Sequence, residues 1–135
     1  MRIGRHLVTT AIVIALSSAG LAAARASDKP QITAAQLKER VAKGEKVTII
    51  DARHDLGGQI VKGAIQVPMD KLEEWAKTID KNSVIVTYCT CPHDEAADAE
   101  VEKLREMGFK NSFALAGGLE AARISGFEIV TPAEK

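Results

Sequence analysis

The chain has 135 residues, 46% of them hydrophobic, and its 18 basic and 18 acidic side chains give a formal net charge of zero. Nucleic-acid-binding domains carry a clustered excess of Lys and Arg, so we expect no nucleic-acid partner. The length fits one domain with a modest hydrophobic core.

Residues 1–26 have the order of a secretory signal peptide. Two arginines come early, residues 7–24 carry no charge, and an A-x-A pattern ends at Ala26. An uncleaved transmembrane anchor is the alternative, because the apolar run is just long enough to span a bilayer. We favour cleavage, which leaves residues 27–135 as a single periplasmic domain. Its membrane contact would then be limited to the signal segment before cleavage.

Strand-like and helix-like segments alternate through the rest of the chain. Thr33 and Gln36 form a capping-box pattern that begins a helix, and Gly44 is its expected end. Leu37 and Val41, four residues apart, would share one face of that helix. The other expected segments are a polar leader at 27–31, strands at 47–51, 64–68, 84–88 and 112–115, a loop at 52–63, helices at 70–79 and 95–107, and a closing FEIV at 127–130.

This alternation predicts an α/β fold, in which helices cover both faces of a parallel sheet. The run at 84–88 is the most apolar of the mature chain, so it is the expected central strand. Ligands of such sheets bind beyond the carboxyl ends of the strands. Cys89 follows this strand directly, which makes the loop after it the expected site.

Both cysteines, Cys89 and Cys91, lie in this loop. Two cysteines in an exported chain usually form a structural disulfide. A bridge across one intervening residue closes almost no chain, however, so its effect on the unfolded state is small and a chemical role is favoured. Backbone N–H groups at a strand-to-helix junction favour a thiolate, which is the nucleophilic form of cysteine.

Five segments in this order resemble a rhodanese-like domain: DAR at 51–53, KGAIQVP at 62–68, VIVTYC at 84–89, EMGF at 106–109 and LAGGLEA at 115–121. The resemblance implies a three-layer α/β fold around a parallel five-stranded sheet. It also implies sulfur transfer through a cysteine persulfide, typically from thiosulfate to cyanide or a thiol, without a cofactor or a metal. The sulfur carrier would be Cys89, with Asp51 and Arg53 holding neighbouring loops. The surrounding loop would comprise Thr90, Cys91, Pro92, His93, Asp94, Glu95 and Ala96.

The loop departs from the family pattern because no basic residue follows the cysteine. Asp94 and Glu95 stand there instead. We interpret them as ordinary helix-capping residues, although they would also weaken the capture of an anion. Alignment on the strand assigns the nucleophile to Cys89, which we favour, whereas alignment on Gly108 assigns it to Cys91. A subset of the family shares a C-[ST]-C-P loop. At the expected tryptophan position near the end of the domain, Ala122 is found.

Three functions fit this loop. The first is sulfur transfer to or from a small sulfur-containing anion or a thiol acceptor, which could be a protein thiol. The second is thiol–disulfide exchange, because a C-x-C disulfide would be strained and oxidising. The third is soft-metal binding by Cys89, Cys91 and His93. We expect a monomer and a non-functional His54. For Arg123, on the last short helix, an approach to the site and a plain surface charge are the alternatives, and we favour the surface charge.

Overall fold

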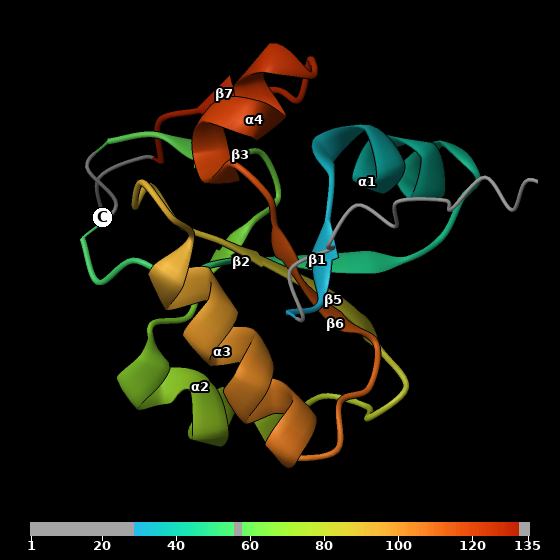
Figure 1. Ribbon diagram of the computed structural model, residues 1–135, viewed down its shortest axis with the longest axis vertical. Helices are drawn as coiled ribbons and strands as arrows, with labels where there is room; N and C mark the ends of the chain where they lie inside the picture. The colour runs from blue at the N-terminus through green and yellow to red at the C-terminus, as the bar shows by residue number, and fades with distance from the viewer. Residues whose placement is uncertain (1–28, 56–57, 133–135) are drawn as a thin grey trace, which may run out of the picture.

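A computed structural model of the chain describes residues 29–55 and 58–132 (Figure 1). The predicted signal peptide lies outside these residues. The elements in chain order are β1 (Gln31–Ile32), α1 (Ala34–Ala42), β2 (Val47–Asp51), β3 (Ile60–Val61), β4 (Ile65–Gln66), α2 (Met69–Ala76), β5 (Val84–Tyr88), α3 (Glu95–Glu106), β6 (Ser112–Leu115), α4 (Gly118–Ile124) and β7 (Ile129–Val130).

The central sheet has five strands in the order β1-β6-β5-β2-β4, and every neighbouring pair is parallel. The predicted central strand, β5, lies in the middle, and four of its five residues are buried. Its last residue, Tyr88, pairs with Asp51 at the end of β2. The carboxyl ends of these two strands therefore meet at one edge, and the predicted α/β fold class is confirmed.

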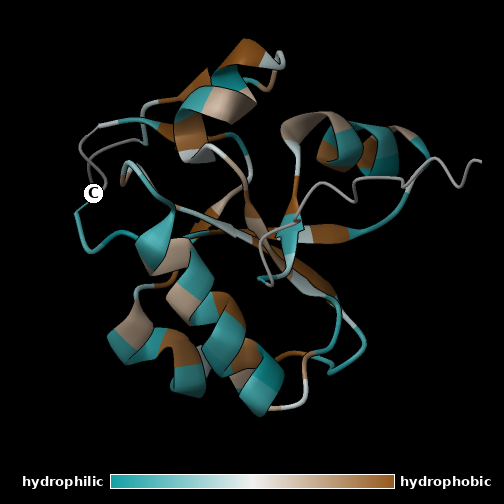
Figure 2. Ribbon diagram, viewed as in Figure 1, coloured by the Kyte–Doolittle hydropathy of each residue, from teal (hydrophilic) through white to brown (hydrophobic). Residues whose placement is uncertain are grey.

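Helices cover both faces of the sheet (Figure 1). Leu37 of α1 and Leu119 of α4 pack with Val86 and Tyr88 of β5 on one face. On the other face, residues of α2 and α3 form a second cluster with alternate sheet residues: Ile50, Val67, Leu72, Ala76, Ile85, Leu104 and Phe109. Figure 2 shows the corresponding pattern, with apolar colour concentrated in the strands and polar colour on the outward faces of α2 and α3.

The α1 start agrees with the sequence prediction, because Thr33 and Gln36 make both hydrogen bonds of a capping box, at 3.1 and 2.9 Å. Of the two residues expected on one face, Leu37 is buried, whereas 46% of Val41 is exposed. Ala122 is 1% exposed in the core, so the small residue at the expected tryptophan position still packs. Within the described ranges, none of the helices has the length and apolar character to cross a bilayer.

Two short strands, β1 and β3, escaped the sequence analysis. β1 lies partly in the segment that was interpreted as a polar leader, and it pairs with β6. β3 lies in the predicted loop at 52–63 and pairs antiparallel with β7, outside the central sheet. Each has only two residues, too few for a strand periodicity to show in the sequence. The helix predicted at 70–79 ends earlier, at Ala76, and is followed by turns.

Candidate active site

Cys89 stands directly after the central strand and is 1% exposed. It forms a disulfide with Cys91, and the two Cα atoms are 5.6 Å apart. Cys91 is only partly buried. The structure therefore brings together the two cysteines that the sequence analysis selected, and it shows them in the oxidised state.

The segment at 116–119, which joins β6 to the start of α4 and is called the α4 turn below, lies against the backbone of the cysteine loop at 89–94. The Leu119 N–H donates a hydrogen bond of 3.1 Å to the carbonyl oxygen of Cys89. A Cβ atom on Gly118 would collide with that same oxygen, and Gly118 has a positive φ of 56°. Only glycine permits both this approach and this conformation at low cost, which gives a physical reason for the Gly-Gly pair after β6.

Asp94 holds the other end of the loop. Its Oδ2 accepts a hydrogen bond of 2.9 Å from the Gly117 N–H, and its side chain is largely buried. Asp94 itself has a left-handed backbone, with φ at 55°, and its side chain makes no capping hydrogen bond within the described part of the chain. The interpretation of Asp94 as an ordinary helix cap is therefore wrong: its carboxylate joins the cysteine loop to the α4 turn.

The remaining loop residues face solvent. Thr90, Pro92, His93, Glu95 and Ala96 are all exposed. His93 does not complete a metal site with the two cysteines, whose sulfur atoms are bonded to each other. Across residues 29–55 and 58–132, no group of three or more His, Cys, Asp or Glu is arranged to hold a metal ion. The soft-metal hypothesis consequently finds no support in this geometry.

Asp51 and Arg53 form a buried ion pair beside the site. Arg53 Nη2 lies 2.6 Å from Asp51 Oδ2, and Arg53 Nε lies 2.9 Å from Oδ1. Hydrogen bonding to Asp51 raises the pKa of Arg53. The same guanidinium donates to the Gln59 carbonyl at 2.6 Å, while the Ala52 N–H donates to the Tyr88 carbonyl at 2.9 Å. The ion pair thus joins the end of β2 to the segment before β3, while the Ala52 backbone joins the same region to the end of β5.

Tyr88 links the site to the small two-stranded sheet. Its hydroxyl oxygen accepts a hydrogen bond of 3.0 Å from the Val61 N–H of β3. The tyrosine is fully buried, and this burial raises the pKa of its hydroxyl. Tyr88 therefore stays neutral near pH 7, and its hydrogen bond anchors the end of β5, which Cys89 directly follows.

A cavity of about 290 Å³ opens beside the disulfide. Cys91, Thr90 and Arg123 are among its lining residues, with Gly117, Leu119 and Glu120 completing the wall. Arg123 donates to Gln59 at 2.7 Å and lies 3.4 Å from Glu120. Arg123 is exposed, as expected, but it also brings to the cavity a cation that the cysteine loop lacks. The sequence analysis raised an approach of Arg123 to the site but favoured a plain surface charge, because the placement depends on how α4 packs.

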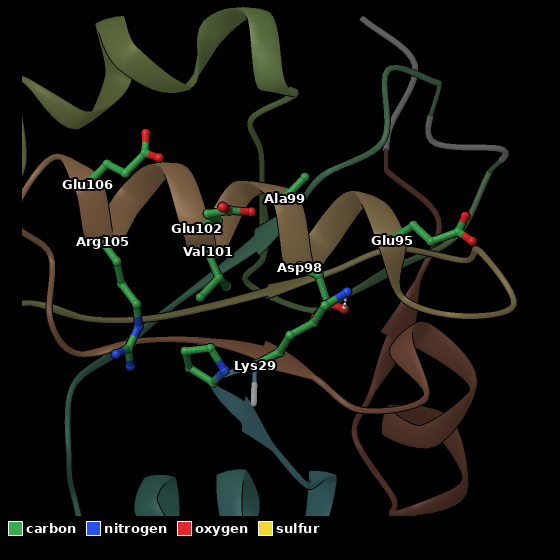
Figure 3. A pocket seen from close by; sticks show the side chains of 9 residues that line it. Lys29, Glu95, Asp98, Ala99, Val101, Glu102, Arg105 and Glu106 are labelled. Carbon is green, nitrogen blue, oxygen red and sulfur yellow. Dashed lines mark hydrogen bonds and ion pairs between the residues drawn. The ribbon is translucent and has the colours of Figure 1, made fainter. Parts of the chain in front are cut away.

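A larger groove of about 610 Å³ runs along α3 near β1 and contains neither cysteine (Figure 3). Its acidic residues are Glu95, Asp98, Glu102 and Glu106. Lys29 partly balances them through an ion pair of 3.1 Å with Asp98. We assign no sulfur chemistry to this groove.

Glu100 is a buried carboxyl that the sequence analysis missed. It is 1% exposed on α3, and neither carboxyl oxygen has a hydrogen-bond partner within the described residues. Burial, together with the charge of Asp51, raises its pKa to about 8. Its spacing from Ala97 and Leu104 places it on the buried face of α3, and this spacing could have identified it.

The comparisons with known proteins agree with this fold. The model of the rhodanese-like domain family matches residues 33–124, and the chain belongs to that family. The solution structure of the rhodanese-like domain from the Alr3790 protein of Anabaena sp. is 30% identical, with a TM-score of 0.65 over 79% of this chain and 87% of that one. The BH2092 protein of Bacillus halodurans is 29% identical, with a TM-score of 0.66 over 76% and 77%.

Among curated proteins, the chain is similar to the thiosulfate sulfurtransferase GlpE of Coxiella burnetii. The identity is 32% over 60 residues, which is 44% of this chain and 54% of that protein. The chain thus spans about half the length of the curated relatives it matches.

Proposed function

We propose that this protein is an exported sulfurtransferase that carries sulfane sulfur as a persulfide on Cys89. The observation that carries the proposal is the position of Cys89: it is buried at the carboxyl end of the central strand of a rhodanese-like domain. Proteins with a parallel α/β sheet bind their ligands beyond this edge of the sheet. The similarity to thiosulfate sulfurtransferases supports the same reaction class.

The reaction starts from the reduced loop. The Cys89 thiolate attacks the outer sulfur of a thiosulfate-type donor, the bond between the two donor sulfur atoms breaks, and sulfite leaves. Cys89 then holds a persulfide, whose outer sulfur passes to a thiol acceptor, small or proteinaceous. Because the structure holds Cys89 in a disulfide, reduction must precede this step.

Arg123 is the proposed cation for the donor anion, since it lines the cavity that Cys91 also lines. Glu120 offsets part of its charge, so we expect modest capture of the doubly charged thiosulfate. An Arg123→Gln variant should raise the KM for thiosulfate several-fold with little change in kcat, and Arg123→Lys should restore part of the loss. An unchanged KM would remove Arg123 from the site.

The test of the proposed function is direct. Reduced protein is freed of reductant, incubated with thiosulfate, and assayed for the sulfite that each chain releases. Wild type and Cys91→Ser should each release one sulfite per chain, and Cys89→Ser should release none. If thiosulfate yields no sulfite and no other sulfane donor adds a sulfur atom to Cys89, or if Cys89→Ser performs as well as wild type, the proposal is wrong.

The disulfide itself favours a second candidate, thiol–disulfide exchange with other proteins. The two candidates differ in their need for sulfane sulfur. An exchange protein would oxidise a reduced substrate protein without any sulfur donor, and it would accept no sulfur from thiosulfate. Thiol titration of protein purified without reductant measures how much of the population starts in the oxidised form.

We further propose that the protein acts as a monomer in the periplasm. The signal-peptide pattern of residues 1–26 supports export. Cell fractionation and N-terminal sequencing should find the mature chain in the periplasm, starting at Ser27. An N-terminus at Met1 in the membrane fraction would support the anchor alternative instead. Sedimentation measures the oligomeric state.

A further inference from the structure

The bond between Cys89 and Cys91 has a consequence for the fate of the sulfur, provided that the proposed function holds. Only Thr90 separates the two cysteines, and the loop brings their sulfur atoms into covalent contact. In the reduced state, Cys91 is therefore positioned to reach the Cys89 sulfur atom. Cys91 also lines the cavity beside the loop, whereas Cys89 is 1% exposed.

We infer that Cys91 resolves the Cys89 persulfide within the same chain, so that the protein releases hydrogen sulfide and ends as the disulfide that the structure shows. The Cys91 sulfur attacks the inner sulfur of the persulfide. A new bond joins the Cys89 and Cys91 sulfur atoms, the bond to the outer sulfur breaks, and the Cys91 proton leaves with that sulfur as HS⁻.

The electrons balance over the two steps. The outer sulfur of thiosulfate is reduced to sulfide, and the two electrons come from the cysteine pair, which becomes a disulfide. In sum, thiosulfate and the reduced protein give sulfite, hydrosulfide and the oxidised protein. A dithiol reductant must then restore the two thiols before the next cycle.

Intramolecular attack has a large advantage in this loop. Groups held in one geometry react with effective concentrations far above those of a free thiol in solution. The two side chains lie on one short loop that is tied at both ends: Leu119 bonds the Cys89 carbonyl, and Asp94 bonds the Gly117 N–H. An external thiol, in contrast, must enter the cavity before it can meet the persulfide.

The exposure of the two cysteines also predicts how the protein is reset. The partly buried Cys91 is the more accessible sulfur of the disulfide, because it lines the cavity while Cys89 does not. The reducing dithiol therefore attacks Cys91 and forms a mixed disulfide with it. This attack releases Cys89 as the thiolate, which is ready for the next donor. The reaction that supplies this step is dithiol–disulfide exchange.

A single-turnover experiment tests the inference. Reduced protein, freed of reductant and kept without oxygen, receives excess thiosulfate, after which sulfite, sulfide and the mass of the protein are measured. Wild type should release one sulfite and one sulfide per chain and become about 2 Da lighter through disulfide formation. Cys91→Ser should release one sulfite, release no sulfide, and become about 32 Da heavier through a retained persulfide. Val41→Ala, at an exposed position of α1 that does not line the cavity, serves as the control and should behave as wild type.

The possible outcomes separate this inference from the function on which it rests. Release of sulfite with a stable persulfide on wild type, and no sulfide, would overturn the inference and leave the sulfurtransferase proposal intact. Sulfide release by Cys91→Ser without any added thiol would overturn it as well. If neither protein releases sulfite, the sulfurtransferase proposal itself fails. Cys91→Ala repeats the test with a side chain that cannot form hydrogen bonds.

Discussion

Glu100 offers a sharp test of the packing beneath the site, because it is a buried carboxyl group whose two oxygens lack hydrogen-bond partners among the described residues. Burial raises its pKa from 4.5 to about 8. Between these values the folded chain keeps the proton, while the unfolded chain releases it. The free energy of unfolding therefore falls as pH rises through this window, which is opposite to the usual behaviour of a glutamate in an ion pair.

The magnitude follows from the size of the shift. Each pH unit within the window costs about 1.4 kcal/mol. From pH 5 to pH 7, Glu100 should therefore remove about 2 to 3 kcal/mol of stability. This loss is a large share of the total stability of a small domain, which is about 5 to 15 kcal/mol.

Glu100→Gln removes the ionisation and nearly keeps the shape. Urea unfolding of the oxidised protein at pH 5, 6 and 7, followed by the fluorescence of Trp75, the single tryptophan, gives the two stability profiles. Between pH 5 and pH 7, the free energy of unfolding should fall by about 2 to 3 kcal/mol more in wild type than in Glu100→Gln, because the other titrating groups are common to both proteins. Parallel profiles would refute the raised pKa and the dry environment that causes it. Glu100→Met, which removes the buried polar atoms, should be more stable than wild type at pH 7.

Three other substitutions probe the contacts of the loop, each by urea unfolding. Gly118→Ala places a methyl group against the Cys89 carbonyl oxygen and should destabilise by about 2 to 4 kcal/mol, because a collision adds to the strain of positive φ. Asp94→Ala removes the acceptor for the N–H of the α4 turn and should cost about 1 to 3 kcal/mol. Arg53→Ala leaves a buried carboxylate without its partner and should cost about 3 to 5 kcal/mol.

Matched variants separate these causes. Gly44 has a positive φ of 82° but open space around it, so Gly44→Ala should show the backbone strain alone and cost less than Gly118→Ala. Equal costs at the two glycines would contradict the close approach. Asp94→Asn keeps an acceptor oxygen and a residue that tolerates the left-handed backbone, so it should be milder than Asp94→Ala. A wild-type stability for Arg53→Ala would show that the ion pair has no supporting role.

The elements that the sequence predicted best are specified locally. The apolar run at 84–88 matches β5 residue for residue, and the capping box at Thr33 forms as expected. The position of Cys89 at the sheet edge followed from the strand end alone. In each of these cases, a few neighbouring residues are enough to predict the local structure.

Other features depend on residues far apart in the sequence and gave no such signal. β3 and β7 are each two residues long and exist because they pair with each other. The role of Asp94 depends on the α4 turn, which lies 23 positions away. An approach of Arg123 to the site was the less favoured alternative, because its place in the cavity wall depends on how α4 packs beside the loop. Glu100 is the exception, since its helical spacing already placed a carboxyl on a buried face.

The most direct test of the central claim is the chemical state of the two cysteines in the cell. Cells fed with thiosulfate are treated with a thiol-alkylating reagent before lysis, and the peptide that contains Cys89 and Cys91 is analysed by mass spectrometry. The account predicts two forms, the Cys89–Cys91 disulfide and a chain with one extra sulfur on Cys89, and it predicts that Cys91→Ser shifts the population to the persulfide. A peptide with no added sulfur on Cys89 in either protein, at any thiosulfate level, would contradict the claim that Cys89 carries sulfane sulfur.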